Sequence, residues 1–292
     1  MKHQGKLTVL VVLITIIAGV ASGIGIISSG GPGPYAYESI RGEVVEIYGT
    51  GIYRHMSADV AVQGIAQDVI TLFIGIPMLW ISLFLARSGS LSGRYMLAGT
   101  TGYFLVTYLF YLVMGMYNIL FLAYASLLGM SFFSFLLTVL GFQPEELPGL
   151  YKNESPVRLS GLFLMINSLA ISLLWLGVVL PPLFEGSIYP VELQHYTTLI
   201  VQGLDLGLLL PAGFVAGWLL YRKRPFGFLF GPVYLIFLSI LMAALVSKIV
   251  AMGMAGQPIF PVIIIMPTIF IISVTCSVWM LRSIRVVPLA HS

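Results

Sequence analysis

The chain has 292 residues, of which 59% are hydrophobic and only 9% are charged, whereas soluble domains carry about 25% charged residues. A soluble fold has no means of hiding so much apolar surface, so the composition excludes a soluble domain and predicts a polytopic membrane protein. The net charge of +3 gives no indication of nucleic-acid binding, because the basic residues follow the membrane topology described below. The one cysteine, Cys276, permits no intramolecular disulfide and is expected to be a small buried hydrophobic residue.

The first half of the chain is expected to hold four membrane helices. The apolar run 7–27 exceeds the usual apolar length of a signal peptide, so we expect a retained helix. The alternative is that residues 1–27 are a cleaved signal peptide, because Ala21-Ser22-Gly23 resembles a signal-peptidase site. Residues 28–61 are polar and begin with the turn-rich SSGGPGP, and they predict a small ordered cap with a short strand at 44–48. The next helices are expected at 62–85, 95–116 and 119–140.

The second half repeats this pattern after a polar, proline-containing linker. Its helices are expected at 159–180, 197–220, 226–251 and 259–281, with a polar loop between the first two. The predicted fold is therefore all-α, a transmembrane bundle of about eight spans. The predicted parts are a first four-helix half (1–141), a linker (142–158) and a second half (159–292).

Lysine and arginine are distributed unevenly between the predicted loops. With the N-terminus inside, every inner segment is basic, whereas the outer segments hold only Arg41 and Arg54, with Lys248 near the outer end of helix seven. The positive-inside rule then predicts that both termini are cytoplasmic. Trp80 and Trp218 fall near inner helix ends, where interfacial aromatic residues are common.

Helices two and six resemble each other, which suggests an internal repeat. Both carry the letters VQG near the start, an aspartate soon afterwards (Asp68, Asp205) and a mid-helix proline (Pro77, Pro211). Four spans per half give both halves the same orientation, so the repeat would be parallel, with its axis along the membrane normal. Chance similarity between apolar segments is the alternative.

The two aspartates are the main candidates for a functional site. A carboxylate inside a bilayer is costly and usually faces the protein interior or a water-filled cavity. We expect Asp68 and Asp205 to lie in the outer half of the membrane around one outward-facing pocket, with Tyr111 of helix three at a similar depth. The other candidate binding residues are Gln63, Gln67 and Gln202. The alternative is that these polar groups only join the helices by hydrogen bonds or an Asp–Lys pair.

Other chemistry has weaker signals. His55 and His195, with the outer carboxylates, are candidate metal ligands, but their spacing fits no compact metal motif, and solvated loop residues are the simpler interpretation. The sequence has no nucleotide-binding or hydrolase motif, so a cofactor is not identified.

Several stretches give the chain a family resemblance. YGTGIYRHMSADVAVQGIAQDVITL, ARSGSLSGRYMLAGTTGYFLVTYLFY, MYNILFLAYASL and LDLGLLLPAGFVAGWLLYRKRPFGF resemble a group of prokaryotic polytopic integral membrane proteins with no assigned function. The resemblance implies a prokaryotic inner-membrane location and transfers no catalytic residue.

Three functional hypotheses follow from these observations. The first is transport of a small solute, cation or proton through the outward-facing site. The second is a membrane-embedded enzyme acting on a lipid or isoprenoid, with the same carboxylates as acid or base. The third is a non-catalytic partner or sensor subunit that uses the loop 28–61. The sequence does not determine the oligomeric state.

Overall fold

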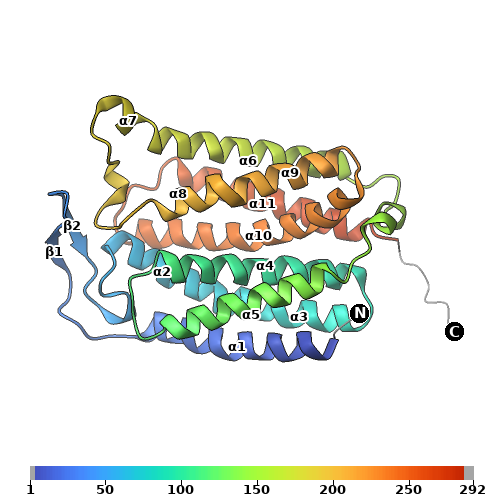
Figure 1. Ribbon diagram of the computed structural model, residues 1–292, viewed down its shortest axis with the longest axis horizontal. Coiled ribbons are helices and arrows are strands. Elements are labelled where there is room, and N and C mark those ends of the chain that lie inside the picture. The colour runs from blue at the N-terminus through green and yellow to red at the C-terminus, as the bar shows by residue number, and fades with distance from the viewer. Residues whose placement is uncertain (1–3, 286–292) are drawn as a thin grey trace.

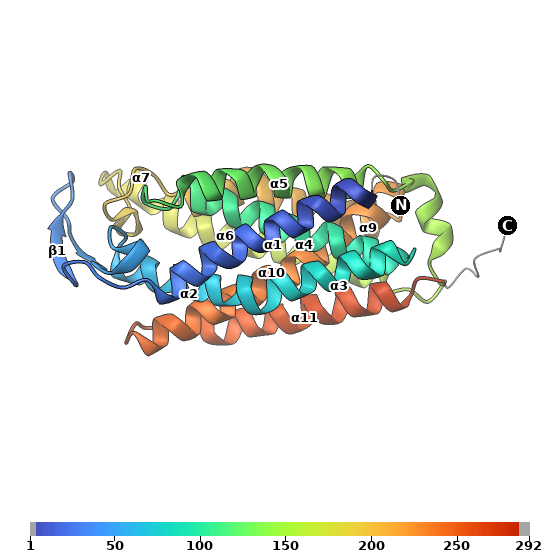
Figure 2. The ribbon, with the colours of Figure 1, turned by 90° about the horizontal axis from the view of Figure 1, so that it is seen from below.

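A computed structural model describes residues 4–285 and contains eight apolar helical spans, which confirms the predicted all-α bundle. The spans lie side by side along the long axis of the molecule (Figures 1 and 2). In chain order they are α1 (Gln4–Ile27), α2 to α3 (Ala58–Arg87), α4 (Leu91–Val113), α5 (Phe121–Val139), α6 to α7 (Val157–Glu185), α8 to α9 (Ile200–Tyr221), α10 (Pro225–Met254) and α11 (Val262–Arg282).

The bundle is organised around α10, which packs against α2, α4, α9 and α11. Large apolar side chains cover the outside of the other helices; Phe84 and Leu122, for example, are 74% and 75% exposed. Such a surface is unfavourable in water but suits a lipid solvent, where helices satisfy their own backbone hydrogen bonds. The protein is therefore a multi-pass membrane protein.

Two of the spans are interrupted by a π-helical turn, which the sequence did not predict. The first span runs through α2 (Ala58–Ile70), η2 (Thr71–Gly75) and α3 (Ile76–Arg87). The second runs through α8 (Ile200–Leu204), η5 (Asp205–Leu209) and α9 (Leu210–Tyr221). A proline follows each π turn, at Pro77 and Pro211. Because proline has no N–H to donate, it releases a carbonyl of the preceding turn, and the wider π turn accommodates this change.

The two interrupted spans and their following turns have the same backbone geometry at a spacing of 134 residues. After the first span, Ser88 N donates to Phe84 O and Gly89 N donates to Ala86 O. After the second span, the equivalent hydrogen bonds run from Arg222 N to Trp218 O and from Lys223 N to Leu220 O. Gly93 and Gly227 occupy equally tight positions against the preceding helix.

This spacing differs from the one suggested by the letters VQG. Val62 and Val201 are 139 residues apart, whereas Pro77 and Pro211 are 134 apart. At the spacing of 134, Asp205 occupies the place of Thr71, and Gln202 occupies the place of Asp68. The two aspartates are therefore not at equivalent positions of these spans.

One end of the bundle, here called the hairpin end, carries the predicted cap (Figure 1). Its β1 (Tyr35–Glu38) and β2 (Val44–Ile47) pair antiparallel, with Tyr35 opposite Ile47; the sequence predicted only the second strand. A short 3-10 turn, η1 (Gly51–Tyr53), follows. Gly49 has φ +70°, and a Cβ there would overlap the Gly33 carbonyl, so the chain crossing beneath the hairpin requires glycine.

The second loop at the hairpin end contains α7 (Pro181–Glu185) and η4 (Val191–Leu193). We expected the helix over 159–180 to be followed by a loop, but α7, which begins at Pro181, follows α6 (Val157–Val179) almost at once. Proline is tolerated in the first turn of a helix, where its missing N–H has no partner to lose.

At the opposite, terminal end, the two halves are joined by η3 (Pro144–Leu150), which packs against α10. Tyr151 forms an antiparallel bridge with Ile284, so the linker also contacts the end of the described chain. Ten basic residues of the described chain lie in or next to the loops of this end: Lys6, Arg87, Arg94, Lys152, Arg158, Arg222, Lys223, Arg224, Arg282 and Arg285.

Candidate functional site

Asp68 lies inside the bundle in a cage of tyrosine side chains and is only 3% exposed. Tyr53 Oη donates a hydrogen bond of 2.5 Å to Oδ2, and Tyr111 Oη lies 2.9 Å from Oδ1. The Tyr111 hydroxyl is also 3.1 Å from the Gly64 carbonyl, so its one proton can serve only one of these acceptors at a time. Both partners of the carboxylate are neutral, and its charge is not neutralised by a directly bonded cation.

Small residues on α1 allow this carboxylate to fit against the helix. A Cβ added at Gly25 would lie only 1.8 Å from Asp68 Oδ2. Ala18, Ala21 and Ser22 are also buried on α1, and small residues at such spacings let membrane helices approach closely. Ser22 Oγ is buried without a hydrogen-bond partner among the described residues. Because Gly25 has no side chain, the backbone of α1 can approach the carboxylate and close this side of the cage.

A second layer of hydrogen bonds lies one turn deeper. Gln67 Nε2 donates to Tyr103 Oη at 2.8 Å and lies 3.3 Å from Thr107 Oγ1. The Tyr103 hydroxyl is also 2.9 Å from Thr71 Oγ1, on the π turn. Gln67 therefore holds α2 against α4, which is the packing role weighed for it from the sequence. Above this layer, the Tyr111 and Tyr124 rings stack with centroids 5.2 Å apart.

Asp205 lies in a different setting, at the first residue of η5. Trp175 Nε1 of α6 donates to Asp205 Oδ2 at 2.8 Å, and the aspartate is half-buried. The Leu209 carbonyl, at the end of the same π turn, accepts a hydrogen bond from Tyr234 Oη of α10 at 2.8 Å. Each carboxylate therefore has its own aromatic partners. The expectation that the two would share one pocket was wrong.

Lys248 of α10 links the two carboxylates electrostatically. Its charge acts on both Asp205 and Asp68. Within residues 4–285, however, the hydrogen bonds that these carboxylates accept come from tyrosine and tryptophan, not from this lysine. One ammonium thus serves two carboxylates, which leaves one negative charge to be balanced when all three groups are ionised.

A lid made from both loops of the hairpin end covers the Asp68 cage. Arg41 Nη1 and Nη2 donate to the carbonyls of Gln194 and Tyr196 at 3.0 and 2.9 Å. Gln194 Nε2 donates to Asp59 Oδ2 at 2.9 Å, and the Tyr196 hydroxyl accepts from Ser57 N at 3.2 Å. These contacts join residues separated by more than 130 positions in the chain. We call these five residues the clasp.

Tyr53 connects the clasp to the cage, because it lies on η1, four residues before Ser57. Its side chain is 3% exposed. Burial, followed by the neighbouring Asp68 charge, raises the pKa of Tyr53 well above its usual value. Burial also raises the pKa of Tyr196. Both hydroxyls therefore stay protonated and neutral over the physiological range. The predicted outward-facing site is closed here, with Tyr53 as its cover.

The two candidate metal ligands come together without forming a metal site. His195 Nε2 lies 3.1 Å from the His55 carbonyl, so the two loops meet at these residues. In the described part of the chain, no group of three or more histidine, cysteine, aspartate or glutamate side chains is arranged to hold a metal ion. The histidines belong to the contact between the loops.

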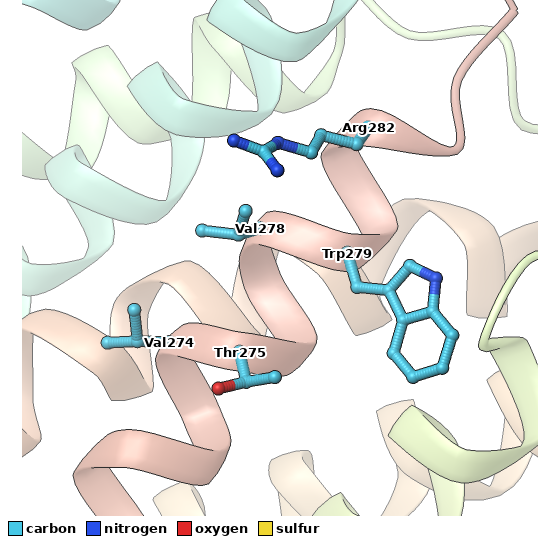
Figure 3. Close-up of a pocket in the computed structure, with 5 residues that line it drawn as sticks. All are labelled: Val274, Thr275, Val278, Trp279 and Arg282. Atoms are coloured by element: carbon cyan, nitrogen blue, oxygen red, sulfur yellow. The ribbon is translucent and has the colours of Figure 1, made fainter.

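A groove of about 430 Å³ at the hairpin end lies beside the second aspartate. It is formed by the end of α6, the loop before α8 and the first turns of that helix, and its lining includes Val179, Tyr189, Gln202 and Leu206. A second hollow, of about 370 Å³, runs along α11 and is lined by residues of that helix alone (Figure 3). Only the first contains a predicted site residue, Gln202.

The structure thus places most of the predicted binding residues in two clusters. Asp68, Gln67 and Tyr111 lie in or beside the cage; Asp205 and Gln202 lie at or near the groove. Gln63 is half-buried and has no side-chain hydrogen bond to another described residue, so it belongs to neither cluster.

Sequence reasoning missed Tyr53, Gly25 and Trp175. Two signals for them were present. The small residues of helix one recur on one face, which is typical of close helix packing. Trp175 lies near the outer end of its predicted helix, where tryptophan is common, and its indole N–H still requires an acceptor when the ring is partly buried. Tyr53 had no local signal, because its contact depends on the path of the loop.

Comparison of the chain with models of known protein families, with curated protein sequences and with solved structures yields no significant match.

Proposed function

We propose that the protein is a secondary transporter that couples the movement of a small solute to proton binding at Asp68. The charge balance of the membrane interior carries this proposal. Among the aspartate, glutamate, lysine and arginine residues of the spans, Asp68, Asp205 and Lys248 lie furthest from the span ends, and two carboxylates share one ammonium. An uncompensated charge inside a membrane is costly, so this arrangement favours uptake of one proton or cation.

A proton suits Asp68 better than a hard metal ion. Calcium takes six to eight oxygen ligands and magnesium about six, whereas Asp68 is surrounded by two tyrosine hydroxyls and the Gly64 carbonyl. Tyrosine hydroxyls both donate and accept, so they can hydrogen-bond either the carboxylate or the carboxylic acid. The cage therefore tolerates both protonation states without a rearranged coordination shell.

The interrupted spans support movement of this part of the bundle. Both have a π turn before a proline, and the first aspartate precedes one such turn while the second begins the other. Transporters with two related halves often bind their ligands at discontinuous helices and alternate by rocking one part against the other. We propose on this basis that the halves 1–141 and 159–292 are a parallel repeat that moves in this way.

The direct test is proton movement in proteoliposomes that contain a pH-sensitive dye. Candidate solutes are added outside and the internal pH is followed. The expected result is a solute-dependent pH change with the parent protein and with Glu46→Gln, which removes an exposed carboxylate of the hairpin, but not with Asp68→Asn. Equal pH changes for parent and Asp68→Asn would refute the role of Asp68.

For location, we propose a prokaryotic inner membrane with both termini in the cytoplasm. The ten basic residues of the terminal end, against Arg41 and Arg54 at the hairpin end, support this orientation. Cysteines introduced by Glu43→Cys and Glu154→Cys, in a Cys276→Ser background, test it. A membrane-impermeant maleimide applied to intact cells should label only the first; labelling of only the second would reverse the orientation.

One observation favours a second candidate, a partner or sensor subunit acting through the cap. All residues of β1 are exposed, and Ile40 and Val44 on the hairpin are 91% and 73% exposed at a surface that lies beyond the spans. Such apolar exposure is typical of a protein contact. Under our proposal, the double variant Ile40→Ser with Val44→Ser should transport as the parent does. If the variant still folds but no longer co-purifies with a defined subunit, the partner role is favoured.

A further inference from the structure

We infer that the groove beside Asp205 binds an organic cation with an apolar body, and that this cation takes over the electrostatic role of Lys248 at Asp205. This inference rests on the proposed transport function and gives its substrate class. The groove's volume of about 430 Å³ falls in the range of about 300–1,000 Å³ typical of small-molecule sites.

The Trp175–Asp205 pair is not part of the groove lining, but it lies one helical turn deeper than two lining residues, Val179 and Gln202. Val179 lines the groove and is four residues after Trp175 on α6; Gln202 lines it and is three residues before Asp205. Residues three or four apart share a helix face. The hydrogen-bonded pair therefore lies beneath the groove, where the head of a bound ligand would meet it.

The polar groups of the groove favour a cation. Asp205 Oδ2 accepts from Trp175, and among the described residues Oδ1 accepts no hydrogen bond. Tyr189 also lines the groove, and its ring is already engaged by the Arg41 guanidinium, 5.2 Å from the ring centroid, so the attraction for a ligand cation comes from Asp205. An anion would find no basic side chain among the lining residues.

The other walls favour an apolar body. Val179, Leu193, Leu199 and Leu206 line the groove with side chains that offer no hydrogen bond. A small inorganic cation would leave these walls without a partner, and the described chain has no cluster of three metal-binding side chains. A hydrophobic amine or a quaternary ammonium or phosphonium ion matches both parts of the groove.

Cation binding would change the charge balance at Asp68. The charged or titratable groups that interact with Asp205 are Lys248 and Tyr234 of α10. Those that interact with Asp68 are Lys248 and five tyrosines, Tyr53, Tyr103, Tyr108, Tyr111 and Tyr124. When a permanent cation neutralises Asp205, Lys248 is left to balance Asp68, and a proton held there is released. The inferred exchange is one organic cation for one proton.

The test uses tetraphenylphosphonium, which cannot itself exchange a proton, and neutral triphenylphosphine oxide as its uncharged control. Calorimetry on the purified full chain measures binding, and a pH dye in weak buffer measures proton release. We expect tetraphenylphosphonium alone to bind, and to bind at least tenfold more weakly to Asp205→Asn. Thr275→Ala, in the hollow on α11, should leave binding unchanged and excludes that hollow as the site. Asp68→Asn should bind the cation without releasing a proton.

Two results would overturn the inference: no binding to the parent protein, or equal binding to parent and Asp205→Asn. If Asp205→Asn does not fold, Leu206→Trp, which fills the groove and keeps the carboxylate, decides in its place; unchanged binding there also overturns the inference. A failure of the proposed function gives a different result. The cation would still bind at Asp205, but proton release would be equal in the parent and in Asp68→Asn.

Discussion

Adding a single methyl group at position 25 should disrupt the Asp68 cage. In Gly25→Ala the new Cβ would lie 1.8 Å from Asp68 Oδ2 and 2.7 Å from its Cγ. Carbon and oxygen need a separation of about 3.5 Å, so the carboxylate must move by more than an ångström. That movement breaks the 2.5 Å hydrogen bond from Tyr53.

The cost can be estimated from two contributions. A hydrogen bond to a charged group contributes about 1.5–3 kcal/mol, and inserting a methyl group into a packed interior costs about 1–3 kcal/mol. For a protein somewhat smaller than this one, 1 kcal/mol corresponds to about 2–4 °C in melting temperature. Gly25→Ala should therefore melt about 5–15 °C below the parent.

The assay is thermal unfolding in detergent, followed by tryptophan fluorescence. Gly23→Ala is the matched control on the same helix, because a Cβ there meets no atom within 4 Å. In an Asp68→Ala background, Gly25→Ala should cost much less, because the obstructing carboxylate is absent. An equal loss of stability in both backgrounds would refute the close approach of α1 to Asp68.

Three further predictions concern the lid and the two carboxylates. Arg41→Ala removes two hydrogen bonds of the clasp, so hydrogen exchange of residues 186–199 should accelerate several-fold; unchanged exchange, or equal acceleration in the control Arg54→Ala, would contradict the clasp. The raised pKa of Tyr53 contributes stability that is complete below the unfolded value of about 10 and is lost as pH rises above it. Tyr53→Phe should therefore flatten the alkaline fall in stability, and a parallel curve would count against a buried, neutral Tyr53. Trp175→Phe removes the hydrogen bond to Asp205 but keeps the carboxylate, so its loss of tetraphenylphosphonium affinity should be severalfold smaller than that of Asp205→Asn. An equal or greater loss of affinity in Trp175→Phe would argue against a direct contact between the cation and the carboxylate.

The number and order of the spans could be predicted from the sequence because lipid imposes a simple pattern. Each span must be apolar for about 20 residues, and the polar loops between them are easy to locate. The depth of Tyr111 relative to Asp68 also followed from counting residues along two antiparallel helices, and their hydroxyl and carboxylate do meet at 2.9 Å.

The closed state of the site was not predictable in the same way. It depends on Tyr53 and on a clasp between residues such as Arg41 and Tyr196, which are 155 positions apart. Loop paths of this kind are determined by tertiary contacts, not by periodicity. The π turns were also missed, because a π turn differs from an α turn by one residue and leaves the apolar pattern almost unchanged. The letters VQG then suggested a pairing of Asp68 with Asp205 that the backbone does not follow.

The most direct test of the central claim is infrared difference spectroscopy of the purified protein in lipid as tetraphenylphosphonium binds. The carboxylic-acid stretch of a protonated aspartate is resolved from other bands and is sensitive to its hydrogen bonds. We expect cation binding to remove one such band in the parent protein, and we expect this change to be absent in Asp68→Asn. A band that is unaffected by the cation, or that changes equally in Asp68→Asn, would show that Asp68 does not exchange the proton.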